Sequence, residues 1–79
     1  MTNALKVGVV GVGSLGRHHA RLLRDLPGAH LVGIHDTDGA RLRAVGEELG
    51  VTTFDHLEPL LDRVEAVVVA VPTIAHEPV

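Results

Sequence analysis

The sequence predicts an α/β fold in which a doubly wound parallel sheet is flanked by helices, and two observations support this. Short runs of apolar, mostly β-branched residues are typical of strands buried on both faces. They alternate with stretches whose apolar residues recur at helical spacing. Such alternation implies parallel strands joined by right-handed crossovers. The chain has 79 residues, enough for one small domain or part of one.

Three segments have the composition of buried strands, and one further segment is a weaker candidate. The three are residues 7–10, 31–34 and 66–71, and the weaker one is residues 51–54. In a doubly wound sheet, about four such strands take the order 3-2-1-4. The chain would then be the N-terminal portion of such a domain.

Helical periodicity and capping residues predict the helices between these strands. The first helix ends at Pro27 and Gly28. The second follows Asp38 as N-cap and ends at Gly50, and the third begins at Asp55 with Glu58 completing a capping box. Thr73 is expected to cap a fourth. The predicted buried face of the first helix is Leu15, His19, Leu22, Leu23 and Leu26, opposite Arg17, Arg21 and Arg24, and that of the second is Leu42, Val45 and Leu49.

Composition excludes several classes of function. Seven Lys and Arg against ten Asp and Glu give a net charge of −3, and aromatic residues make up 1%, so we expect no nucleic-acid partner. The absence of Cys excludes disulfides and a Cys nucleophile. The longest apolar run, residues 66–71, is far shorter than the roughly 20 residues of a membrane span. With no secretory signal evident at the N-terminus, a cytoplasmic protein without a membrane partner is expected.

A glycine-rich segment carries the main functional signal. Gly11-Val12-Gly13-Ser14-Leu15-Gly16 matches G-x-G-x-x-G, follows a predicted strand and opens a predicted helix. Asp36 stands 20 residues after Gly16, at the end of the next strand. This context is the fingerprint of a dinucleotide-binding site. The alternative is that these are turn and packing glycines beside an acid that only caps a helix or loop.

Each part of the fingerprint has a physical role. Gly11 allows the tight turn, Gly13 lets the backbone approach a pyrophosphate, and Gly16 allows close packing of helix on strand. The helix N-terminus offers N–H groups to phosphate. Asp36 would accept hydrogen bonds from the ribose hydroxyls and repel a 2′-phosphate, which favours NAD, while Arg41 leaves room for NADP.

The histidines do not predict a metal site, because no pair has the i, i+4 spacing of helical ligands. His19 is expected in the core, and His35 either lines an adenine pocket or belongs to a loop. Because ligands bind beyond the carboxyl ends of the strands, Val71, Pro72 and Thr73 should flank the cofactor. His76 either touches cofactor or substrate or packs in the fold. The six histidines are His18, His19, His30, His35, His56 and His76.

These stretches resemble the N-terminus of the Gfo/Idh/MocA oxidoreductases. The resemblance rests on residues 6–20, with His19 extending the glycine motif to G-x-G-x-x-G-x-x-H, on residues 32–36, and on residues 69–73 with His76. The family usually has Thr before this proline and Asn after it, where this sequence has Val71 and Thr73. Polar contacts from those two positions are therefore not expected to be the same.

The resemblance implies hydride transfer between a nicotinamide cofactor and a hydroxyl of a sugar, sugar nucleotide or cyclitol. The family's catalytic Lys lies in a Glu-Lys-Pro motif that this sequence lacks, so no catalytic residue is assigned here and the chain alone should be inactive. A further domain would supply substrate contacts and the interface of a homo-oligomer.

Other readings of the same residues stay open. A non-catalytic module that senses NAD(H) or an adenosine nucleotide would need only the glycine loop and Asp36. Flavoproteins usually have Glu at the position of Asp36, and methyltransferases have an acid near the end of the first strand, so both match less well. We also expect weak folding or self-association, because residues 66–71 would form an apolar edge strand.

Overall fold

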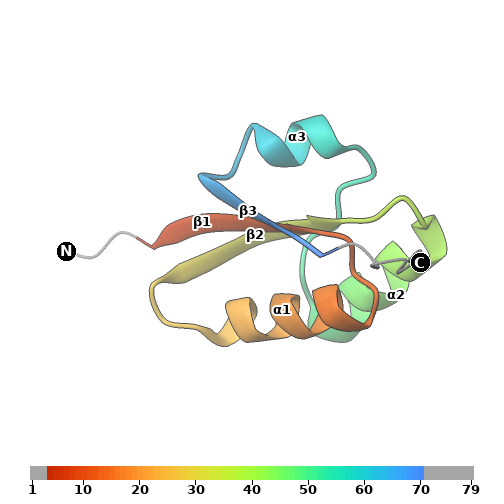
Figure 1. Ribbon diagram of the computed structural model, residues 1–79, viewed down its shortest axis with the longest axis horizontal. Coiled ribbons are helices and arrows are strands. Elements are labelled where there is room, and N and C mark those ends of the chain that lie inside the picture. The colour runs from red at the N-terminus through yellow and green to blue at the C-terminus, as the bar shows by residue number, and fades with distance from the viewer. Residues whose placement is uncertain (1–3, 71–79) are drawn as a thin grey trace, which may run out of the picture.

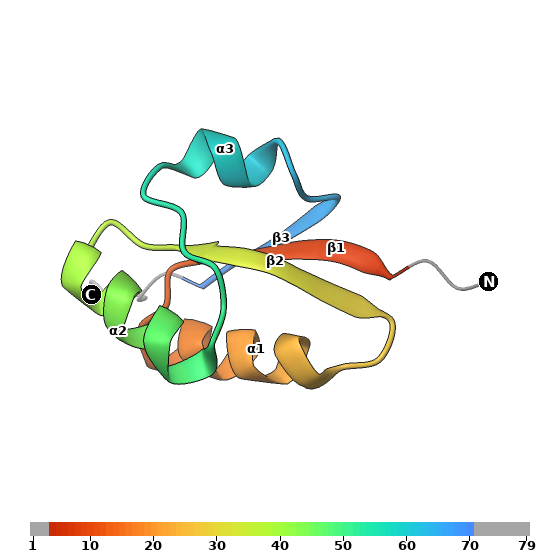
Figure 2. The same ribbon diagram turned by 180° about the vertical axis from the view of Figure 1, so that it is seen from behind.

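The computed structural model describes residues 4–70, which form three strands and three helices. The strands make one sheet that lies between two layers of helices. Helices α1 and α2 cover one face of the sheet and α3 covers the other (Figures 1 and 2). No helix in this range is long and apolar enough to cross a membrane. The elements are β1 (Leu5–Val10), α1 (Ser14–Asp25), β2 (Ala29–His35), α2 (Gly39–Leu49), α3 (Leu57–Leu61) and β3 (Ala66–Val69).

The sheet is parallel, as predicted, with the order β2-β1-β3. The prediction of about four strands in the order 3-2-1-4 is wrong in its number of strands: the described residues form three, and their order is the 2-1-4 part of the prediction, since β3 is the predicted fourth strand. The weaker candidate, residues 51–54, lies beside β2 but pairs with it only through the bridge between Ile34 and Thr53. Two backbone hydrogen bonds join it to β2, from the N–H of Ile34 to the carbonyl of Thr52 and from the N–H of Phe54 to the carbonyl of Ile34, and the chain bends at Asp55 directly after them.

The main core lies between the sheet and the pair α1 and α2. The prediction for α2 is confirmed: Asp38 caps its start, Gly50 ends it, and its three predicted apolar residues are buried. Leu60 of α3 is buried on the other face, where it packs against Gly8 of β1. The residues of the main core are Val9, Val12, Ala20, Ile34, Leu42, Val45 and Leu49.

The buried face of α1 differs from the prediction. The helix buries Gly16 and Ala20, while Leu15 and Leu22 are 60% and 53% exposed. Of the predicted leucines, Leu23 is half-buried and packs against the core. Small residues face the sheet because the helix approaches it closely: a Cβ at Gly16 would overlap the carbonyl of Gly11. Hydrophobic periodicity alone assigns the face to the large leucines, since it contains no information about how closely a helix packs.

The side of α1 opposite its predicted buried face carries arginines that contact α2. Arg17 forms an ion pair with Glu48 of α2. Arg24 donates a hydrogen bond of 3.0 Å to the carbonyl of Leu49. These arginines therefore join α1 to α2, and the exposed leucines lie on the side of α1 that faces away from α2.

The start of α3 also differs from the prediction. The helix begins at Leu57 after His56, and no side chain caps it, so Asp55 is not its N-cap. Pro59 accounts for the shift. In a helix capped by Asp55, residue 59 would donate the first intrahelical hydrogen bond, and proline has no N–H to donate. With His56 as N-cap, that bond falls to Leu60 and Pro59 lies within the first turn.

Candidate functional site

The glycine loop connects β1 to α1 and is held against the end of β2. Gly11 has a φ of 88°, a left-handed conformation that favours glycine, and its N–H donates a bond of 2.8 Å to the carbonyl of His35. Gly16 lies against the backbone carbonyl of Gly11, so position 16 has no room for another side chain. The two glycines thus produce the tight turn and the close packing that the motif predicts.

The N-terminus of α1 is left without a cap. Gly13 is its N-cap residue, no side chain bonds to the first turn, and no acid lies within it. The first N–H groups of a helix have no partner inside it, and they carry about half a positive charge. By contrast, Asp38 caps α2 with a bond of 3.1 Å from the N–H of Arg41. The α1 terminus therefore keeps its N–H groups available to an anion.

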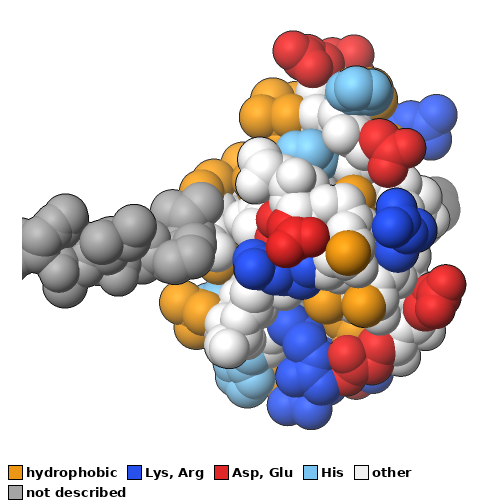
Figure 3. Space-filling view, turned by 90° about the vertical axis from the view of Figure 1, so that its right-hand side faces the viewer, with side chains coloured by type: hydrophobic (Ala, Val, Ile, Leu, Met, Phe, Trp, Pro, Cys, Tyr) orange, Lys and Arg blue, Asp and Glu red, His pale blue; other side chains and the backbone are white. Residues whose placement is uncertain are grey.

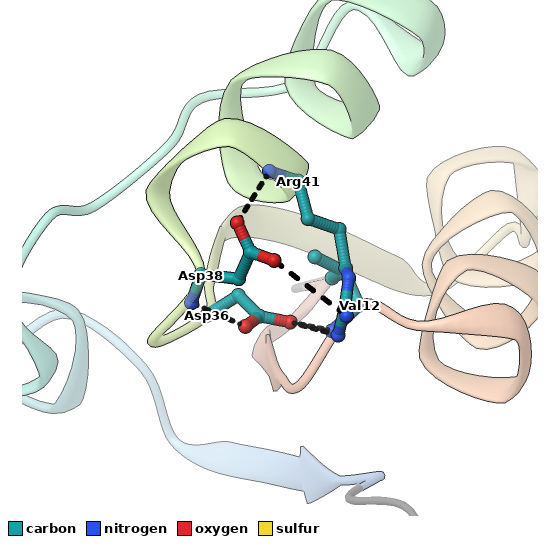
Figure 4. Close-up of polar contacts among 4 residues, drawn as sticks. All are labelled: Val12, Asp36, Asp38 and Arg41. Atoms are coloured by element: carbon teal, nitrogen blue, oxygen red, sulfur yellow. Dashed lines mark hydrogen bonds and ion pairs between the residues drawn. The ribbon is translucent and has the colours of Figure 1, made fainter.

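Asp36 joins the glycine loop to the start of α2 (Figure 4). Its carboxylate is buried, with the residue 8% exposed, and accepts a bond of 2.8 Å from the N–H of Val12 and one of 2.7 Å from the N–H of Asp38. Burial opposes ionisation. The two backbone bonds and the charge of Arg41 outweigh this effect, so the pKa of Asp36 lies below its ordinary value. Asp36 is thus a carboxylate at neutral pH.

Arg41 places a positive charge beside the two acids. Its Nη1 lies 3.5 Å from an Asp36 oxygen, and its Nη2 lies 3.7 Å from an Asp38 oxygen. The same Nη1 is 3.6 Å from the point where a Cβ of Gly13 would stand. The guanidinium therefore lies across the glycine loop and contacts both acids, although its side chain stays 43% exposed.

These groups surround a pocket of about 320 Å³ beyond the carboxyl ends of β1 and β2. Figure 3, which looks onto this end of the molecule, shows acidic and basic side chains beside one another rather than a surface of one charge. Leu57 of α3 adds an apolar wall that nothing in the sequence indicated. The lining residues are Val10, Gly11, Gly13, His35, Asp36, Thr37, Asp38, Arg41 and Leu57.

The predicted site residues fall into three groups. Gly11, Gly13 and Asp36 line the pocket. Four others belong to the same loop or helix start: Val12 and Gly16 are buried, while Ser14 and Leu15 are exposed. The remaining four, Val71, Pro72, Thr73 and His76, lie outside the described residues, as does the expected N-cap role of Thr73.

Two histidines that the sequence left open can be placed. His35, the last residue of β2, is buried, lines the pocket and has its Nδ1 2.8 Å from the carbonyl of Phe54. This bond holds the ring in place beside Asp36. His19 is half-buried on α1 rather than part of the core.

Comparison with known proteins identifies a family with an NAD-binding fold. The family model described as an oxidoreductase family with an NAD-binding Rossmann fold matches residues 5–79. The inositol 2-dehydrogenase of Corynebacterium glutamicum strain ATCC 13032 is 41% identical over the whole of this chain, which covers 25% of that enzyme. The chain thus spans about a quarter of the length of this curated relative.

Solved structures share the fold. The UDP-N-acetylglucosamine 3-dehydrogenase GnnA of Acidithiobacillus ferrooxidans is 34% identical with a TM-score of 0.78, over 91% of this chain and 22% of that one. GenD2 from gentamicin A biosynthesis, solved in complex with NAD, is 34% identical with a TM-score of 0.79, over 91% of this chain and 21% of that one.

Proposed function

The chain belongs to the Gfo/Idh/MocA oxidoreductases, a family with an NAD-binding Rossmann fold, and we propose that its described residues hold the adenosine and pyrophosphate half of NAD. One observation carries this proposal. An uncapped helix N-terminus, a glycine loop and an ionised acid surround a single pocket at the carboxyl ends of the strands. Ligands of open α/β sheets bind at this position.

Each group suits one part of the cofactor. The free N–H groups at the start of α1 would bind the pyrophosphate, and Gly13 would let it approach the backbone. Asp36 would accept hydrogen bonds from the adenosine ribose. The adenine would lie toward Leu57 and His35, which together offer an apolar wall and a fixed ring. The other side is proposed to be closed by Val71, Pro72, Thr73 and His76.

We propose further that the whole protein is a homo-oligomeric, cytoplasmic dehydrogenase that acts on a hydroxyl of a sugar, sugar nucleotide or cyclitol. The printed activities of inositol 2-dehydrogenase and UDP-N-acetylglucosamine 3-dehydrogenase support this substrate class. The catalytic groups and the substrate contacts would come from parts of the protein that this chain does not include. The chain itself would then bind cofactor without turning it over.

Calorimetric titration of the purified chain tests the cofactor half-site. We expect ADP-ribose to bind about as tightly as NAD, and nicotinamide mononucleotide to bind far more weakly, because the proposal assigns only the adenosine and pyrophosphate half to the described pocket. Gly13→Val should abolish binding of both ADP-ribose and NAD. Gly13 has a φ of −67°, which valine can adopt, so the added side chain would block the pyrophosphate without preventing folding.

Gly39→Ala is the matched control, because Gly39 lies on α2 and a Cβ there would have only the Arg43 side chain nearby, at 3.8 Å. This variant should bind NAD like the unaltered chain. Circular dichroism establishes that each variant is folded. A folded chain that binds neither NAD nor ADP-ribose, or a Gly13→Val variant that binds both normally, would contradict the proposal.

A further inference from the structure

His35 lines the pocket with a buried ring whose two nitrogens have different surroundings. The residue is 9% exposed, and its Nδ1 lies 2.8 Å from the carbonyl oxygen of Phe54. A carbonyl oxygen only accepts hydrogen bonds, so Nδ1 carries the hydrogen. In the neutral ring the second nitrogen, Nε2, is then an acceptor.

The Phe54 carbonyl that fixes this tautomer is itself held in place. The N–H of Phe54 donates a bond of 2.8 Å to the carbonyl of Ile34, and its ring lies on Gly33 of β2, where a Cβ would overlap it. The guanidinium of Arg63 lies over the same ring, 5.9 Å from its centre. The His35 ring therefore cannot turn over without losing its bond to a fixed partner.

Nε2 of His35 has no hydrogen-bond partner among residues 4–70. A buried acceptor without a donor costs free energy, and such atoms are normally paired in native proteins. Because His35 lines the pocket, a bound molecule that brings an N–H group to this ring edge would supply the missing donor. Adenine carries such a group, the amino group at C6, whereas hypoxanthine carries a carbonyl oxygen at the same position.

We propose that Nε2 of His35 accepts a hydrogen bond from the amino group of adenine, which makes His35 a specificity-determining residue for the base of the cofactor. The inference rests on the proposed cofactor half-site, in which the adenine lies toward His35 and Leu57. With hypoxanthine in that position, a carbonyl oxygen would face another acceptor. The site would then select its base by a hydrogen bond as well as by the apolar surface of Leu57.

Titrations with NAD and with nicotinamide hypoxanthine dinucleotide, in which a carbonyl replaces this amino group, test the proposal. The purified chain should bind NAD about three- to tenfold more tightly, the effect of one neutral hydrogen bond. His35→Asn should remove the difference by weakening NAD binding. The asparagine amide can still donate to Phe54 from the place of Nδ1, but it has no atom at the place of Nε2. His30→Asn, the same change at an exposed histidine of β2 outside the pocket lining, should keep the difference.

Nitrogen NMR of the unaltered chain is a second measurement, one that a merely structural role of His35 would not affect. At about pH 8, where histidine is ordinarily neutral, Nδ1 should carry the hydrogen and Nε2 should not. Adding ADP-ribose should then shift the Nε2 signal more than the Nδ1 signal. A hydrogen on Nε2 of the neutral ring, or an unmoved Nε2 signal when ADP-ribose binds, would overturn the role of His35.

The outcomes separate this inference from the proposed function. If the unaltered chain binds NAD and the hypoxanthine analogue equally, the role of His35 is wrong and the half-site stands. The same holds if His35→Asn keeps the difference or weakens both ligands in parallel, because His35 would then serve only the fold or the part common to both. If the folded, unaltered chain binds neither NAD nor ADP-ribose, both proposals fail.

Discussion

Asp36 is the residue on which the geometry of the site depends. Its carboxylate accepts hydrogen bonds from the N–H groups of Val12 and Asp38, so it fixes the glycine loop and the start of α2 relative to each other. The spacing to Gly16 predicted an acid facing a ribose, but not this internal role. Sequence distance identifies which strand end the acid follows. It does not show that two backbone N–H groups converge on the acid, because that depends on the packed loop.

Stability should therefore depend on pH through Asp36. Its pKa is lowered on folding, so its contribution to the free energy of unfolding is present above the unfolded value of about 3.9 and is lost as the pH falls through the folded pKa. Urea unfolding of the chain between pH 7 and pH 3 should show this loss, and Asp36→Asn should reduce the pH slope. Thr37→Ser, an uncharged change next to it, should keep the slope. Equal slopes for Asp36→Asn and the unaltered chain would contradict this role.

Gly16, in the first turn of α1, leaves no space for a larger side chain. A Cβ there would overlap the backbone carbonyl of Gly11, which a side-chain rotation cannot relieve. We expect Gly16→Ala to lower the free energy of unfolding by at least about 2 kcal/mol. In urea unfolding, Gly39→Ala should instead raise it by roughly 0.4–1 kcal/mol, because alanine restricts the unfolded chain. Similar effects of the two substitutions would show that the contact with Gly11 is unimportant.

Among the elements, the sequence predicts those whose signals are local. It does not predict how a helix is oriented where that depends on packing against a distant segment. β1, β2 and α2 follow from apolar runs, an N-cap aspartate and a left-handed glycine, all of which act within a few residues. The orientation of α1 depends on Gly16 meeting Gly11 across the loop, and helical periodicity does not describe that approach. In the pocket, the contribution of Leu57 depends on where α3 crosses the sheet.

The cap of α2 can be tested by stability alone, without a cofactor. The Asp38 side chain accepts the N–H of Arg41 in the first turn. Asp38→Ala should cost about 0.5–2 kcal/mol in urea unfolding, and Asp38→Ser should recover most of it, since serine also caps. Glu47→Ala, at an exposed acid on the same helix, should stay within about 0.5 kcal/mol of the unaltered chain. An unchanged unfolding midpoint in Asp38→Ala would mean that α2 does not need this cap.

At the scale of the molecule, the described part of the chain leaves two apolar surfaces uncovered. One is the side of α1 that carries Leu15 and Leu22. The other is β3, which pairs only with β1 among the described residues and exposes Val67 and Val69 by 38% and 62%. Val68, between them, packs against the core, so β3 is apolar on both faces.

The outer edge of β3 is expected to drive self-association, since its backbone N–H and C=O groups are a template for another strand. The sedimentation coefficient of the chain should rise with concentration. Val69→Lys should suppress that rise, because a charge on an edge strand opposes pairing. Leu22→Lys places the same charge on the exposed side of α1 and should leave the association in place. If Leu22→Lys suppresses it and Val69→Lys does not, the leucine surface of α1 rather than the strand edge brings the copies together.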